Sequence, residues 1–172
     1  MNKAEAIRVI DEKQALLDDV NDSIWEYAET AFQEFKSMDK LCEALEQEGF
    51  KVEKGVGDIP TAFTGTYGHG KPVIGLLGEF DALSGLSQVG GCPEKKALVP
   101  GAAGHGCGHN CLGTAALAAA WAAKEFMEKN HLSGTVRYYG CPGEEYGSAK
   151  AFMARDGLFD DVDACFTWHP GT

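Results

Sequence analysis

The chain has 172 residues and is strongly acidic, with 15 Lys and Arg against 26 Asp and Glu and a formal net charge of −11. This balance excludes a protein that holds nucleic acid through a general basic surface, because phosphate contacts need clustered cations. Hydrophobic residues make up 44% and charged residues 24%, which excludes widespread disorder and fibrous repeats. Glycine is unusually frequent, at 22 residues, and gathers between Gly55 and Gly147, where the backbone needs special geometry.

The sequence contains no pattern typical of a secretory signal or a membrane span. Residues 1–13 carry scattered charges and no apolar run of the length that a signal peptide needs. The longest apolar stretch, 112–123, falls short of the roughly 20 residues that a membrane span requires. We therefore expect a cytoplasmic protein without membrane contact, and six cysteines that remain thiols instead of forming a disulfide framework.

The first fifty residues predict helices. Apolar residues near helical spacing indicate one helix over 4–19 and a second helical segment over 22–48, broken within 32–37. Gly49 suits the left-handed position just beyond a helix, so the second segment is expected to end there.

Beyond Gly49, short strands alternate with helices. An alanine-rich helix is predicted over 112–129 and a shorter one over 149–155. The predicted strands are 50–53, 61–67, 72–77, 135–140 and 164–168. This order predicts the α/β class, a layered sheet with crossover helices. No repeat or low-complexity linker divides the chain.

Polar residues follow three of the predicted strands. These residues are Glu79 and Asp81 after the third strand, Glu144 and Glu145 after the fourth, and His169 after the fifth. Function in α/β sheets gathers at the carboxyl ends of strands, so these side chains are candidates for one shared site.

A glycine-laced segment, GHGCGHN over 104–110, opens the alanine-rich helix. The helix N-terminus is expected to favour a thiolate at Cys107. A thiolate, imidazoles such as His109 and several carboxylates are ligands of zinc or a similar divalent ion, and spare carboxylates indicate an open, catalytic site.

Each candidate also has a structural interpretation. Cys107 and Cys111 lie four positions apart and could both face the core from one helical turn. The Glu pair could be surface charge, His169 an ordinary histidine at a strand end, and Asp81 a turn cap. For His69 and His131, which lie in polar loops, a surface position is expected. A hydrolase with Cys107 as nucleophile and a histidine as base also stays open.

Four motifs together resemble the dinuclear metal-dependent amidohydrolases that include aminoacylase, hippurate hydrolase and carboxypeptidase G. They are GLLGEFDALSGLSQ, PGAAGHGCGHNCLGTAALAAA, GTVRYYGCPGEEYGSAKAFM and GLFDDVDACFTWHP, in the family's order. Relatives are longer, so residues 1–172 are expected to form the N-terminal part of the catalytic domain, without the lid or dimerisation domain and without the C-terminal part.

The resemblance implies a role for each candidate residue. The implied metal ligands are Cys107, His109, Glu145 and His169, with Glu144 as general base and Asp81 beside the metal site. The resemblance leaves two residues without a role: Glu79, where other branches have a histidine ligand, and Asn110, which replaces an aspartate.

The resemblance also implies an activity. One or two divalent ions, Zn or Mn, would activate water, and Glu144 would pass its proton to the leaving amine of an N-acyl or N-aroyl amino acid such as an aminobenzoyl-glutamate. The full-length protein is expected to be a homo-oligomer or a paired subunit. The rival interpretation is a truncated noncatalytic module that binds metal or a partner.

Overall fold

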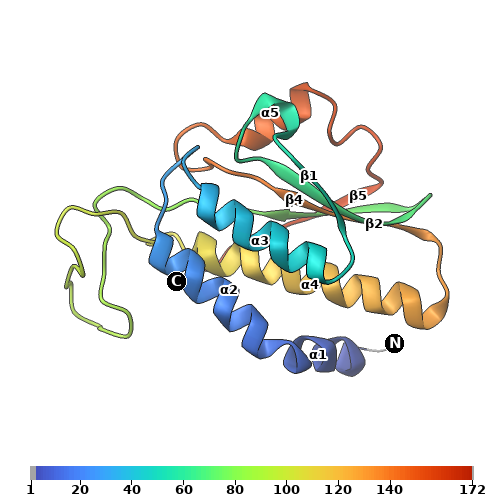
Figure 1. Ribbon diagram of the computed structural model, residues 1–172, viewed down its shortest axis with the longest axis horizontal. Coiled ribbons are helices and arrows are strands. Elements are labelled where there is room, and N and C mark those ends of the chain that lie inside the picture. The colour runs from blue at the N-terminus through green and yellow to red at the C-terminus, as the bar shows by residue number, and fades with distance from the viewer. Residues whose placement is uncertain (1–2, 172) are drawn as a thin grey trace.

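A computed structural model of the chain describes residues 3–171 (Figure 1). Its elements, in order, are α1 (Lys3–Glu12), α2 (Gln14–Tyr27), α3 (Phe35–Gln47), β1 (Lys51–Lys54), the 3-10 helix η1 (Val56–Asp58), β2 (Phe63–His69), β3 (Val73–Gly78), α4 (His109–Asn130), β4 (Gly134–Gly140), α5 (Ala149–Arg155) and β5 (Ala164–Phe166). The predicted α/β class is confirmed.

The described strands form one mixed sheet in the order β1-β2-β4-β3-β5. Strand β3 pairs in parallel with both β4 and β5, and α4 and α5 are the crossovers between these strands. Strand β2 pairs antiparallel with both β1 and β4, a direction that the sequence did not predict. Because β3, β4 and β5 run the same way, their carboxyl ends meet at one edge of the sheet.

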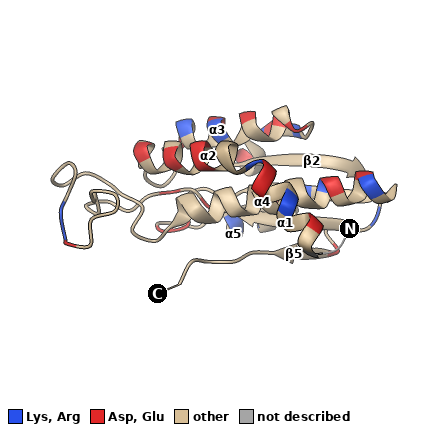
Figure 2. Cartoon of the chain, turned by 90° about the horizontal axis from the view of Figure 1, so that it is seen from below, with Lys and Arg blue, Asp and Glu red and all other residues tan. Residues whose placement is uncertain are grey.

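Helices cover both faces of this sheet. The layer made by α1 to α4 lies on one face, and α5 with η1 lies on the other (Figure 1). Helix α2 carries acidic residues but no Lys or Arg, whereas α3 carries both acidic and basic residues (Figure 2). Among residues 3–171, none of the helices combines the length and the apolar character that crossing a bilayer requires.

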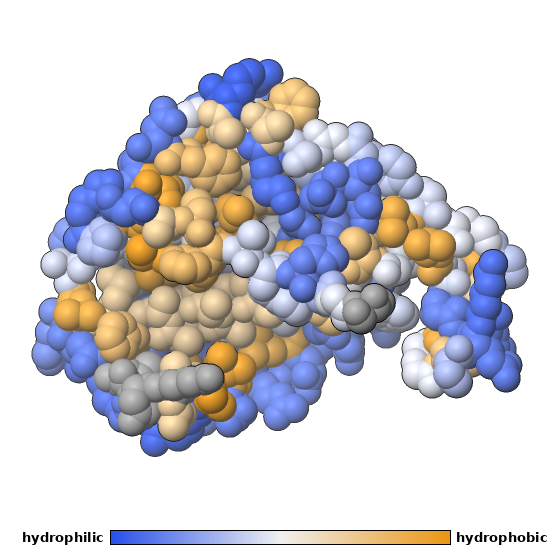
Figure 3. Space-filling view, turned by 180° about the vertical axis from the view of Figure 1, so that it is seen from behind, coloured by the Kyte–Doolittle hydropathy of each residue, from blue (hydrophilic) through white to orange (hydrophobic). Residues whose placement is uncertain are grey.

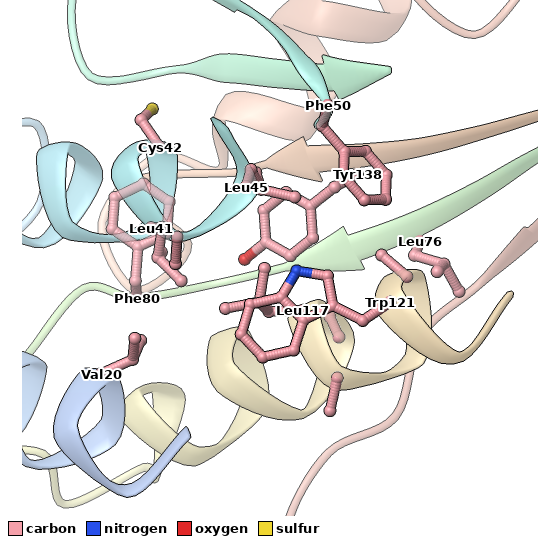
Figure 4. Packing of buried hydrophobic residues seen from close by; sticks show 14 of the residues in the cluster. Val20, Leu41, Cys42, Leu45, Phe50, Leu76, Phe80, Leu117, Trp121 and Tyr138 are labelled. Carbon is pink, nitrogen blue, oxygen red and sulfur yellow. The ribbon is translucent and has the colours of Figure 1, made fainter. Parts of the chain in front are cut away.

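The main core fills the space between the helical layer and the sheet. Trp121 and Leu117 of α4 and Leu45 of α3 point toward Tyr138 of β4, and all four are almost completely buried (Figure 4). The ring of Phe63 stacks on Tyr138 with centroids 5.6 Å apart. Truncating one of these large side chains to alanine costs about 3–5 kcal/mol, so this cluster fixes α4 against the sheet.

On the face seen from behind Figure 1, hydrophobic residues cover much of the surface (Figure 3). Strand β5 is an edge strand, and its Phe166 is 58% exposed. Trp168, just beyond β5, is also exposed.

The helix boundaries differ from the prediction in three places. The break expected within 32–37 lies at 28–34, between α2 and α3. The break expected near Asp19 is wrong: the chain breaks at Lys13, and α2 continues because Leu17, Val20 and Ile24 extend one buried stripe across that position. Helix α4 begins at His109, three residues earlier than predicted. All the predicted strands lie within about two residues of their predicted limits, and β5 ends at Phe166, two residues early. The six cysteines are free thiols, as predicted.

Candidate metal centre

The candidate site lies at the edge where β3 and β4 end and α4 begins. The chain leaves β3 through Glu79 and Asp81, makes a long excursion, and returns where the backbones of Leu83 and Gly104 exchange two hydrogen bonds of 3.0 Å. This pairing delivers the segment 105–109 to the end of β3. Helix α4 therefore starts beside the polar residues that follow the strand.

His109, the first residue of α4, is completely buried and has a fixed orientation. Its Nδ1 lies 2.9 Å from Asp81 Oδ1 and 3.1 Å from the Asp81 carbonyl oxygen. Both are acceptors, so Nδ1 carries the proton and donates it. Nε2 is thereby left to face the other side chains of the site.

His169 is oriented in the same way. Its Nδ1 lies 2.7 Å from the Pro170 carbonyl, and its Nε2 lies 3.3 Å from Cys107 Sγ. The rings of His169 and His109 meet edge to face, with centroids 5.5 Å apart. One candidate ligand atom each from Cys107, His109 and His169 lie within 4.8 Å of one another, which fits a single cation.

Glu79 lies inside the site, although its position in the sequence did not assign it a role. Its Oε2 is 3.0 Å from His109 Nε2, but the two atoms are not aligned for a hydrogen bond. Its Oε1 pairs with the Lys150 ammonium group of α5. Ligand atoms of Glu79, His109 and Glu144 form a second group within 4.8 Å, so a carboxylate face adjoins the thiol and imidazoles.

The two residues of the Glu pair differ in environment. Glu144 Oε2 and Glu145 Oε1 each lie 3.9 Å from His109 Nε2. The side chain of Glu144 is 37% exposed, whereas that of Glu145 is 17% exposed. The Glu145 backbone N–H donates to Asp81 Oδ2 over 3.0 Å. Asp81 therefore holds both His109 and the loop that carries the Glu pair.

Three buried polar atoms of this site have no hydrogen-bond partner among the described residues: His109 Nε2, Glu79 Oε2 and Glu145 Oε1. A buried polar atom without a partner costs free energy, so such atoms mark a place for a ligand. Nitrogen, sulfur and carboxylate donors converge here, and this set suits a borderline divalent cation such as zinc. The residues fit a metal ion.

The electrostatics of the site are dominated by its carboxylates. Burial alone would lower the pKa of His109, but Asp81 and Glu79 outweigh it and raise that pKa to about 10. Burial alone would raise the pKa of Glu79, but His109 and Lys150 lower it to about 2.

The expectation that the helix N-terminus favours a Cys107 thiolate is wrong for this structure. Burial, a contact with Glu145 and the charge of Glu144 raise the pKa of the thiol to about 11. Cys107 also lies outside the helix, which begins two residues later, so the peptide dipoles do not outweigh the carboxylates.

The structure brings together all the side chains that the sequence nominated for one site. They are Glu79, Asp81, Cys107, His109, Glu144, Glu145 and His169. Their roles as ligands, base and positioning residue remain predictions. His69 and His131 are exposed, as expected.

Two residues of the GHGCGHN segment have other surroundings. His105 is buried against α2, where its Nε2 lies 2.9 Å from the Ile24 carbonyl. The side chain of Asn110 donates to Asn21 of α2 over 3.0 Å, so it ties the start of α4 to that helix.

The chain is similar in sequence to known peptidases and hydrolases. Residues 75–172 match peptidase family M20/M25/M40. One of the subunits of p-aminobenzoyl-glutamate hydrolase from Escherichia coli is 59% identical over 152 residues, which cover 88% of this chain and 32% of that protein. Hippurate hydrolase from Campylobacter jejuni is 30% identical over 161 residues, which cover 91% of this chain and 39% of that protein.

The fold agrees as well. A dinuclear metal binding peptidase of the M20 family from Bacillus subtilis superposes with a TM-score of 0.72 at 24% identity, over 92% of this chain and 44% of that one. The chain spans about a third of the length of the curated relatives that it matches.

Proposed function

The chain belongs to peptidase family M20/M25/M40, and on that premise we propose that it forms the metal-binding part of an amidohydrolase. The bond cleaved is the amide of an N-acyl or N-aroyl amino acid, of the aminobenzoyl-glutamate kind. The observation that carries the proposal is the convergence of Cys107, His109 and His169 with the Glu pair at one sheet edge. The 59% identity to a p-aminobenzoyl-glutamate hydrolase subunit supports the substrate class.

The proposed ligands are Cys107, His109, Glu145 and His169, for a zinc or manganese ion. A divalent ion held there supplies a Lewis acid that activates water and polarises the amide carbonyl. His109 and His169 both turn Nε2 toward the site because their Nδ1 atoms are held by oxygen acceptors. Glu145 suits a ligand because its Oε1 is buried and has no hydrogen-bond partner among the described residues.

Glu144 is the proposed general base. It is the more exposed member of the pair, so a water and a substrate can reach its carboxylate. It takes a proton from the attacking water as the C–O bond forms, and delivers that proton to the amine as the C–N bond breaks. Asp81 keeps the His109 tautomer and the Glu145 backbone in place during these steps.

The alternative of a cysteine nucleophile is less well supported. A thiol whose pKa is raised to about 11 is seldom ionised at neutral pH, and the thiolate is the reactive form. The relative from Escherichia coli is named as a subunit, which supports a paired subunit as part of the proposal. We further propose a cytoplasmic protein, which the six free thiols support.

The experiment compares Glu144→Gln and Glu145→Gln, with the exposed Glu43→Gln as a matched control. Bound metal is measured by atomic emission after zinc or manganese is added and excess removed, and turnover by release of glutamate from an aminobenzoyl-glutamate. Glu144→Gln should keep its metal and lose turnover by roughly 10² to 10⁴. Glu145→Gln should lose metal, because an amide is a poorer ligand than a carboxylate. The opposite pattern would reverse the two roles, and wild-type protein without bound metal would refute the site.

A further inference from the structure

A buried carboxylate lies beneath the loop that carries the Glu pair, outside the candidate metal centre. Glu34 is completely buried, and its Oε1 accepts a hydrogen bond of 2.8 Å from the backbone N–H of Gly143. The two residues are 109 positions apart in sequence. Gly143 immediately precedes Glu144, so this bond acts directly on the backbone that carries the proposed base.

The position of Glu34 in its own helix makes this contact unusual. Glu34 is the N-cap of α3, where a side chain ordinarily accepts hydrogen bonds from the first turn, yet it makes no capping bond. Glu29 caps the helix instead, because its carboxylate accepts the N–H groups of Lys36 and Ser37 over 3.1 and 2.9 Å. The Glu34 side chain is thus left to reach the loop.

The backbone of Gly143 makes hydrogen bonds through both its N–H and its carbonyl oxygen. Its carbonyl accepts the N–H groups of Gly147 and Ser148 over 3.1 and 2.7 Å, which closes the loop into a compact turn. Its φ of +62° is a left-handed conformation, and a Cβ there would lie 2.7 Å from the ring of Phe32. The segment 32–34 therefore supports the loop both by packing and by a hydrogen bond.

Two carboxylates accept hydrogen bonds from the backbone N–H groups on either side of Glu144. Glu34 holds the N–H of the residue before it, and Asp81 holds the N–H of the residue after it, over 3.0 Å. The side chain of Glu144 has a single ion-pair contact among the described residues, with His109 Nε2 at 3.9 Å. Its placement is therefore set by the backbone on either side.

We propose that Glu34 is a positioning residue that fixes the Gly143 backbone and thereby aims Glu144 at the metal centre. The inference rests on the proposed function, because it takes Glu144 as the general base. The role needs an acceptor oxygen opposite the Gly143 N–H, and the Glu34 side chain supplies one over 2.8 Å. A small displacement of a base from its reactive geometry costs a large part of the rate.

The first test measures the loop itself by amide hydrogen exchange. Glu34→Met keeps the length of the side chain and removes the acceptor, and it should make the Gly143 amide exchange at least roughly tenfold faster. Glu34→Gln retains an acceptor oxygen and should stay within about threefold of wild type. Glu34→Asp, which keeps the charge but is too short to reach, is a second variant in case Glu34→Met does not fold, and it should also speed exchange. Unchanged exchange at Gly143 in Glu34→Met or, if that variant does not fold, in Glu34→Asp would overturn the proposal.

Glu29→Met is the matched control, because Glu29 supports the same end of α3 without touching the loop. It should speed exchange at Lys36 and Ser37 and leave Gly143 protected. If Glu29→Met loosens Gly143 as much as Glu34→Met does, the effect belongs to α3 as a whole and the proposal fails.

The second test separates positioning from stability in the active enzyme. Glu34→Met should lower kcat on an aminobenzoyl-glutamate at least roughly tenfold with KM and bound metal unchanged, and Glu34→Gln should recover most of kcat. Unchanged kcat despite faster exchange at Gly143 would overturn the link to Glu144. Wild-type protein with bound metal but no turnover would instead refute the proposed function, and the exchange experiment would still decide what holds Gly143.

Discussion

Gly113 of α4 sits where this helix crosses the end of β3, and replacing it sets two effects against each other. A Cβ at this position would lie 2.6 Å from the backbone oxygen of Glu79. On the same turn, the Tyr138 hydroxyl donates to the Gly113 carbonyl over 3.2 Å. The helix therefore approaches the strand as closely as its backbone allows.

The magnitudes predict which effect is larger in Gly113→Ala. Alanine improves the helix propensity by about 1 kcal/mol relative to glycine. Overpacking costs about 1–3 kcal/mol, at the high end here because the overlapping atom is backbone and cannot rotate away. The net result is a loss of about 2 kcal/mol, or a fall in Tm of roughly 4–8 °C for a chain of this length. Metal affinity should fall too, because the overlap pushes α4 away from Glu79, and both Glu79 and His109 lie in the candidate metal centre.

Thermal and urea unfolding of Gly113→Ala measure this loss directly. Ala119→Gly, at an exposed position of the same helix, calibrates the propensity and should cost about 1 kcal/mol. If Gly113→Ala is as stable as wild type or more stable, the close approach of α4 to Glu79 does not limit the packing and the reasoning is refuted.

Three further predictions concern charge and metal. Burial raises the pKa of Glu34 above its ordinary 4.5, so the folded chain binds this proton more tightly than the unfolded chain, and stability falls as the pH rises above about 4.5. Glu34→Gln should therefore melt higher than wild type at pH 7.5 and level with it at pH 4; equal melting at both would contradict this. Lys150→Met should cost about 3 kcal/mol in urea unfolding, because it removes the ammonium partner of the buried Glu79 carboxylate, and a loss below about 0.5 kcal/mol would speak against the pair. Zinc should protect Cys107 from a thiol reagent in wild type but not in Glu145→Gln, with the exposed Cys111 as internal control; equal protection in both would argue against Glu145 as a ligand.

The candidate site was predictable because its signals are local. Each candidate residue follows a strand or opens a helix, and strands that alternate with helices bring their carboxyl ends to one edge. Short polar segments at the ends of apolar runs were therefore sufficient to nominate His109, Glu145 and His169 before any geometry was known.

The supporting residues could not be found in this way. Glu34 and Lys150 meet partners 109 and 71 positions away, and no periodicity encodes such a contact. Strands β1 and β2 were predicted, but their antiparallel direction was not, since strand direction depends on pairing and not on composition. The break at Lys13 lies within a continuous helical pattern, so hydrophobic spacing alone contained no sign of it.

The hydrogen bond from His109 to Asp81 limits how many ions His109 can bind at this edge of the sheet. With Nδ1 donating to Asp81, the imidazole has one lone pair left, on Nε2, and a lone pair coordinates one cation at a time. The group of Cys107 and His169 and the group of Glu79 and Glu144 both include His109. The two groups therefore cannot bind separate ions through His109 Nε2 at the same time, and a second ion would need ligand atoms from other side chains.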